Sequence, residues 1–192
     1  MPELLIHSSA TAEWLSLVHE AEKASDHPLD EEMQSYLVFL LMRFTERPEL
    51  AASVLAVEYL ESMHQLGRAG RDQLRNVGDK CLLYSGLFPQ RAERRRVKIG
   101  YFVDLGRSAY QLLSERLEQG AAVMYQRLAG TFVPLMDVLQ AMRSLGSAEV
   151  LTPLQALELW QETRSRGALR ILRRRTHGMP LMLPAAEDSS RH

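Results

Sequence analysis

The sequence predicts an all-α protein that folds as a single-domain helical bundle of about six to eight helices. Apolar residues recur three and four positions apart along most of the chain, and helix start and stop signals separate these stretches. Runs that alternate polar and apolar residues, which would indicate strands, are nearly absent. A length of 192 residues suits one hydrophobic core. We expect the bundle to span 1–178 and a flexible tail to follow over 179–192.

Three helices are predicted in the N-terminal third of the chain, over about 11–25, 30–45 and 48–66. Asp30 can cap the free amides that begin the second of them. Because 37–42 is apolar all round, we expect this second helix to lie in the middle of the bundle, covered on several sides. Pro48 fits the first turn of the third helix, and Gly67 terminates it.

The remaining predicted helices cover about 71–85, 94–119, 121–145 and 152–175. Pro134 lacks an amide hydrogen and clashes with the preceding turn, so the third of these should kink or break near Gly130. The last has the clearest start, since 152–155 combines a capping threonine, a proline at the first helical position and a glutamine three residues after the cap. Gly167 is a candidate break within it.

Charge is unevenly distributed along the chain and suggests a binding surface. Residues 1–63 carry 12 acidic and 3 basic side chains, although the whole chain has a net charge of −1. One basic cluster covers the loop before the predicted helix 94–119 and the start of that helix, and consists of Arg91, Arg94, Arg95, Arg96 and Lys98; another consists of Arg170, Arg173, Arg174 and Arg175. Arginine recognises carboxylates and phosphates through paired hydrogen bonds. Arginines near the end of a helix also simply favour the negative end of its dipole and stay solvated.

The segment 78–110 combines glycines inside helical patterns with polar aromatic residues. An interior helical glycine costs about 1 kcal/mol relative to alanine, so each of these glycines should be compensated by something. Close approach of two helices is one explanation. The other is a ligand pocket lined by Asp79, Tyr84, Tyr101, Asp104, Arg107 and Tyr110. Tyrosines at helical spacing are more often the edge of a core, which favours the first explanation.

The same segment carries the patterns GDxxLxxxGxFP, from Gly78 to Pro89, and YxxxxGxxAY, from Tyr101 to Tyr110. This spacing resembles that of all-helical bacterial proteins to which no activity is assigned. The resemblance covers about a third of the chain and implies a bacterial cytoplasmic protein. It transfers no catalytic residue and no cofactor.

Several classes of function find no support in the sequence. Glu61 and His64 form one Glu-x-x-His pair, whereas a di-iron bundle needs two such pairs and two more glutamates, so no metal site is predicted. Cys81 falls in the apolar register of its helix and is read as a small buried residue, not a nucleophile. The longest apolar run, 36–42, is too short to span a bilayer. A single cysteine and an opening segment without secretory-signal features favour the cytoplasm.

The prediction is therefore a non-catalytic regulatory or adaptor protein that binds an acidic protein partner or ligand through the cluster at 91–98. A small-ligand receptor or enzyme that uses the tyrosine-lined pocket is the first alternative. A nucleic-acid-binding regulator is the second, disfavoured because aromatic residues are not interleaved with the arginines. No cofactor is predicted, and a homodimer remains open.

Overall fold

The computed structural model describes residues 3–46, 55–90, 97–146 and 151–176, with side chains described from 10 to 174 within these ranges. In these ranges the chain forms nine α-helices and no strand. Their bounds are α1 Glu3–Ser25, α2 Glu31–Glu46, α3 Leu55–His64, α4 Gly67–Gly86, α6 Ile99–Glu115, α7 Gln119–Gly130, α8 Phe132–Leu145, α9 Pro153–Thr163 and α10 Arg166–Thr176. The all-α prediction is confirmed. The predicted tail at 179–192 lies outside the described residues.

The number of described helices is larger than the predicted six to eight, because two of the predicted helices are each divided into two. The first divides at Thr131, so Pro134 lies in the first turn of α8, where its missing amide hydrogen breaks no helical hydrogen bond. The second divides at Arg164, whose φ of 58° places it in the left-handed region that ends α9. Gly167, the predicted break, instead lies inside α10. The predicted capping box at the start of α9 is present, with Thr152 and Gln155 bonded reciprocally.

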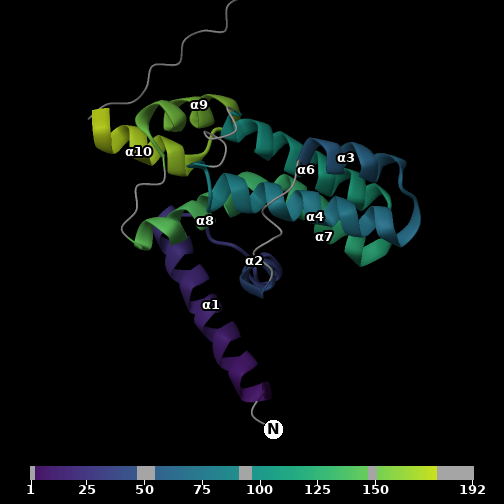
Figure 1. Ribbon diagram of the computed structural model, residues 1–192. Helices are drawn as coiled ribbons and strands as arrows, with labels where there is room; N and C mark the ends of the chain where they lie inside the picture. Colours follow the sequence, from purple (N-terminus) through teal and green to yellow (C-terminus); the bar gives the residue numbers. More distant parts are fainter. Residues whose placement is uncertain (1–2, 47–54, 91–96, 147–150, 177–192) are drawn as a thin grey trace, which may run out of the picture.

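The helices pack mainly as neighbours in pairs (Figure 1). Helix α4 lies along α6, and α6 lies along α7, while α3 covers another side of α4. Helix α1 packs on α2 and α8 and extends away from the other helices toward the N-terminus. Helices α9 and α10 pack on each other near one end of α6. None of the helices described is both long enough and apolar enough to cross a membrane.

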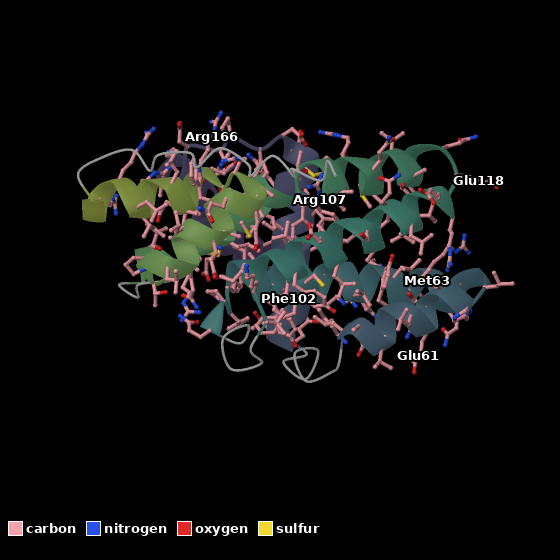
Figure 2. The ribbon with its side chains drawn as sticks, turned by 90° about the horizontal axis from the view of Figure 1, so that it is seen from above. Glu61, Met63, Phe102, Arg107, Glu118 and Arg166 are labelled. Atoms are coloured by element: carbon pink, nitrogen blue, oxygen red, sulfur yellow. The ribbon has the colours of Figure 1, made fainter. Side chains whose placement is uncertain are left out.

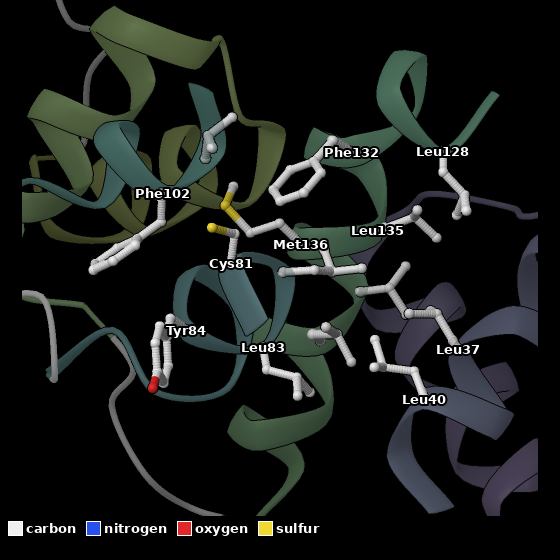
Figure 3. Packing of buried hydrophobic residues seen from close by; sticks show 14 of the residues in the cluster. Leu37, Leu40, Cys81, Leu83, Tyr84, Phe102, Leu128, Phe132, Leu135 and Met136 are labelled. Atoms are coloured by element: carbon white, nitrogen blue, oxygen red, sulfur yellow. The ribbon is translucent and has the colours of Figure 1, made fainter. Parts of the chain in front are cut away.

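One cluster of buried apolar residues draws side chains from all nine described helices. Figure 3 shows part of it, where Cys81 of α4 lies beside Phe102 of α6 and Phe132 and Met136 of α8. Gly106 makes this close approach possible, since a Cβ atom there would lie 2.5 Å from Cε2 of Phe132 and 2.8 Å from Cβ of Cys81. Close helix packing is thus the explanation for this glycine.

Helix α2 lies nearer the surface than its apolar sequence suggests. Leu37, Leu40 and Leu41 are buried, as predicted, but Phe39 is 64% exposed. The helix was predicted to lie in the middle of the bundle and to be covered on several sides, but one face of it is exposed. That face, which also carries Tyr36 and Arg43, borders the site described below.

A buried carboxylate joins three distant parts of the chain. Asp137 of α8 accepts hydrogen bonds from the Ser165 hydroxyl at 2.5 Å and from the Gly167 amide at 3.1 Å. Nε2 of His27, just beyond α1, lies 3.0 Å from Oδ2 of Asp137, the oxygen that also accepts from Gly167. The Asp137 side chain is fully buried, so these contacts hold the ends of α1 and α10 on α8.

Candidate functional site

The most unusual polar cluster in the described chain surrounds the buried carboxylate of Asp79 on α4. Its Oδ1 atom accepts hydrogen bonds from the hydroxyls of Tyr36 at 2.5 Å and Tyr110 at 2.8 Å. Its Oδ2 atom accepts one from Nη1 of Arg43 at 2.9 Å. Three donors from α2 and α6 therefore converge on one side chain. A carboxylate is stable in a core only with such partners.

Two further residues extend this cluster toward the surface. The second terminal nitrogen of Arg43 donates to the side-chain oxygen of Asn76. Arg75 hydrogen-bonds Tyr125 of α7 and also feels the negative charge of Asp79. The Nε atom of Arg75 is buried and has no hydrogen-bond partner among the described residues. This leaves one donor in the cluster without an acceptor.

The three tyrosines pack against one another as well as around Asp79. The rings of Tyr36 and Tyr110 meet edge to face with centroids 6.3 Å apart, and Tyr125 lies 5.9 Å from Tyr110. Gly78 leaves room for the Tyr110 ring, because a Cβ atom on residue 78 would lie 2.4 Å from Cε1 of Tyr110. The glycine that precedes Asp79 therefore makes room for the side chain that binds Asp79.

Burial dominates the protonation behaviour of this cluster. Burial raises the pKa of Asp79 above its ordinary value, although the hydrogen bonds from Tyr36 and Tyr110 and the charges of two arginines act in the opposite direction. Burial and the nearby Asp79 charge raise the pKa of Tyr36 and Tyr110 well above 10, and they also raise the pKa of Tyr125. These phenols stay protonated at neutral pH, so they act as hydrogen-bond donors and not as nucleophiles.

A cleft of about 450 Å³ opens beside the cluster, between α2, α4 and α7. Its lining consists of Tyr36, Phe39, Leu40, Met42, Arg43, Glu46, Arg75, Asp79, Met124 and Tyr125. The size lies within the range of about 300–1,000 Å³ typical of small-molecule sites. The wall combines apolar and aromatic surface with a few converging polar groups, which is the usual composition of such a site.

The structure brings together only part of the pocket predicted from sequence. Asp79 and Tyr110 are hydrogen-bonded, as stated above. Tyr84 is buried against Phe102 instead, with ring centroids 5.5 Å apart, and Tyr101 is 41% exposed. Asp104 and Arg107 line a different groove, of about 810 Å³, between α3, α6 and α7; Figure 2 shows Arg107 at the surface of α6. The predicted single pocket of six residues is therefore wrong.

Sequence reasoning missed Tyr36, Arg43, Arg75 and Tyr125. One signal was available: Tyr36 and Arg43 are seven residues apart, which places them on one face of a helix two turns apart. They are the two polar side chains in the otherwise apolar stretch 36–44 of α2. Which helix that face contacts was not predictable from the spacing.

The predicted partner-binding cluster is mostly beyond the described residues. Arg91, Arg94, Arg95 and Arg96 lie outside them. Lys98 is described, and its Nζ lies 3.0 Å from Oε1 of Glu162 on α9. That hydrogen bond and the charge of Glu162 raise the pKa of Lys98. The lysine is therefore already paired with an acidic side chain.

The arginines of the second basic cluster, at 170–175, do not all have the same role. Arg170 donates from both terminal nitrogens to the backbone oxygens of Ala24 and Ser25 at the end of α1. Arg173 and Arg174 are exposed on α10. Arg170 thus holds two helices together, whereas Arg173 and Arg174 face the solvent; the side chain of Arg175 lies outside the described ones.

The described residues give no support for a reactive cysteine or for a metal site. Cys81 is fully buried, and burial raises the pKa of its thiol, as expected for a small core residue. Within the described part of the chain, no three histidine, cysteine or acidic side chains gather as metal ligands would. Comparisons with protein-family models, curated proteins and solved structures gave no match.

Proposed function

We propose that this chain is a small-ligand-binding protein and that its site is the cleft between α2, α4 and α7. One observation carries the proposal: in the wall of a cleft that also includes the exposed ring of Phe39, a buried carboxylate fixes the side chains of Tyr36 and Arg43. Polar groups fixed in this way are typical of recognition sites, because their orientation is set before a ligand arrives.

The chemistry of the cleft indicates what it takes. Phe39, Met124 and Tyr125 supply a surface for a flat apolar body. Arg43 is already neutralised by Asp79, so Arg75 is the cation available to an anionic group. The unpaired Nε of Arg75 adds a donor. The ligand class is therefore a small amphipathic molecule with an apolar body and one negatively charged group.

The test uses the small molecules that stay bound to the purified protein. The protein is isolated from its native host under non-denaturing conditions, and bound molecules are released and identified by mass spectrometry. Arg75→Gln should lose the bound molecule, whereas Arg107→Gln, in the groove between α3, α6 and α7, should retain it. Equal recovery from both variants, or no bound molecule on the unaltered protein, contradicts the proposal.

We keep the adaptor function as a second proposal. It assumes a cytoplasmic protein, which the single cysteine favours. The observation in its favour is that Arg166, Arg173 and Arg174 are exposed on α10. Changing the four arginines Arg91, Arg94, Arg95 and Arg96 to glutamate should abolish capture of an acidic protein partner and leave the circular-dichroism melt unchanged. An unaltered pull-down would rule it out, and steep salt dependence on DNA would favour the nucleic-acid alternative.

A further inference from the structure

A second pocket lies on the other side of α2, separate from the cleft around Asp79. It measures about 480 Å³ and is formed by α1, α2, α8 and the residues that follow α4. Its lining consists of Trp14, Leu41, Phe44, Thr45, Leu87, Phe88, Gln90, Met142 and Arg143. None of these residues lines the first cleft. The size again falls in the range of about 300–1,000 Å³ for small-molecule sites.

The walls of this pocket are largely apolar. Leu41 and Met142 are buried beneath it, and the rings of Phe44 and Phe88 meet with centroids 5.3 Å apart. Trp14 closes one side and is itself partly buried. The hydroxyl of Thr45 donates to the backbone oxygen of Leu41 one turn earlier, so it is already satisfied. An occupant of the pocket must therefore present mainly apolar surface.

Among the residues that the structure describes, Arg143 is the single charged side chain that lines the pocket. One of its terminal nitrogens donates to the backbone oxygen of Leu87, which positions the guanidinium at the edge of the apolar walls. Guanidinium has five N–H donors, and no carboxylate among the described residues pairs with this one. Its planar fork matches a carboxylate, which can accept two parallel hydrogen bonds.

We propose that this pocket binds a small carboxylic acid with an apolar chain. The apolar body would lie between Trp14, Phe44 and Phe88, and the carboxylate would pair with the remaining donors of Arg143. Charge complementarity selects the acid over a neutral molecule of the same shape, because the described residues of the lining include one cation and no anion. This site is independent of the proposed function, which uses the opposite face of α2.

The pocket contains a natural reporter, since Trp14 is one of only two tryptophans in the chain. The other, Trp160, lies in α9, where it is buried and contacts Arg164. The full chain carrying Trp160→Phe therefore reports on the pocket through Trp14 alone. Decanoate is the probe, and decanol, which has the same chain without the charge, is the neutral comparison.

We expect decanoate to change Trp14 fluorescence saturably and to bind at least about tenfold more weakly when Arg143 is replaced by glutamine, since a charge-assisted pair is lost. Decanol should bind both forms equally. Arg107→Gln, far from this lining, should leave decanoate binding unchanged. Because Arg143 also holds Leu87, a second variant, Thr45→Phe, fills the pocket while keeping the arginine and should remove binding of both probes.

Two outcomes overturn the proposal. The first is no saturable change in Trp14 fluorescence with decanoate, and the second is equal affinity for decanoate with and without the Arg143 guanidinium. A response of the same size from the Trp14→Phe protein, in which only Trp160 reports, would show that decanoate acts elsewhere and also overturns it. Retention of the cleft ligand is measured separately, so failure here leaves the proposed function untouched.

Discussion

Replacing Tyr110 by phenylalanine removes one hydroxyl group from the Asp79 cluster and leaves the buried ring in place. The lost hydrogen bond joins that hydroxyl to Oδ1 of Asp79 at 2.8 Å, away from water. A hydrogen bond to a charged group contributes about 1.5–3 kcal/mol to stability. The same oxygen keeps its bond from Tyr36, so we expect a loss in the lower half of that range, about 1.5–2 kcal/mol. The pKa of Asp79 should rise further, since that bond lowers it.

Urea unfolding followed by circular dichroism at neutral pH measures this loss. Tyr101→Phe is the matched control, because it removes the same atom from an exposed ring and should change stability by less than about 0.5 kcal/mol. A double-mutant cycle with Asp79→Asn isolates the pairwise contribution, which we expect to be about 1 kcal/mol. If Tyr110→Phe costs no more than Tyr101→Phe, the hydroxyl does not stabilise Asp79 and the reasoning fails.

Two further predictions concern the buried carboxylate of α8 and alkaline pH. Asp137→Ala leaves buried donors without an acceptor and should cost about 3–5 kcal/mol in urea unfolding; a loss below about 1 kcal/mol would contradict the contacts described. The site tyrosines have folded pKa values above the unfolded value of about 10, so their contribution to stability is complete below that pH and is lost as pH rises through the folded values. In an absorbance titration, three of the six tyrosines should ionise only together with unfolding; ionisation of all six near pH 10 in the folded protein would refute this.

The helices of this protein were more predictable from sequence than its site. Helix signals such as the capping box at 152–155 act over a few residues, so they can be read locally and recur in the structure. The division at Thr131 was predicted, as a kink or break near Gly130, whereas the division of the last helix was predicted at Gly167 and occurs at Arg164. Arg164 is left-handed without being glycine or asparagine, and the local sequence carries no signal for that conformation.

The predicted pocket failed for a geometric reason that the helical period explains. Tyr101 and Tyr110 are nine residues apart on α6, which at 3.6 residues per turn separates them by about half a circle. One can face the core only if the other faces away, as the exposed Tyr101 and buried Tyr110 show. Asp79 and Tyr110 came together because α4 and α6 pack along each other. The contribution of α2 was not predictable, since it depends on which helices become neighbours across long separations in the chain.

The position of α2 determines the shape of both cavities. One face of the helix contributes Tyr36 and Arg43 to the first cleft, and the other contributes Leu41 and Thr45 to the second pocket. Tyr36 and Arg43 both bind Asp79, so this carboxylate holds α2 against α4. Loss of the carboxylate therefore alters a wall of each cavity, and binding at both sites should weaken. Loss of the Arg143 guanidinium, which lines only the second pocket, should weaken binding at that pocket alone. This asymmetry separates the residue that organises the helices from the residue that recognises a ligand.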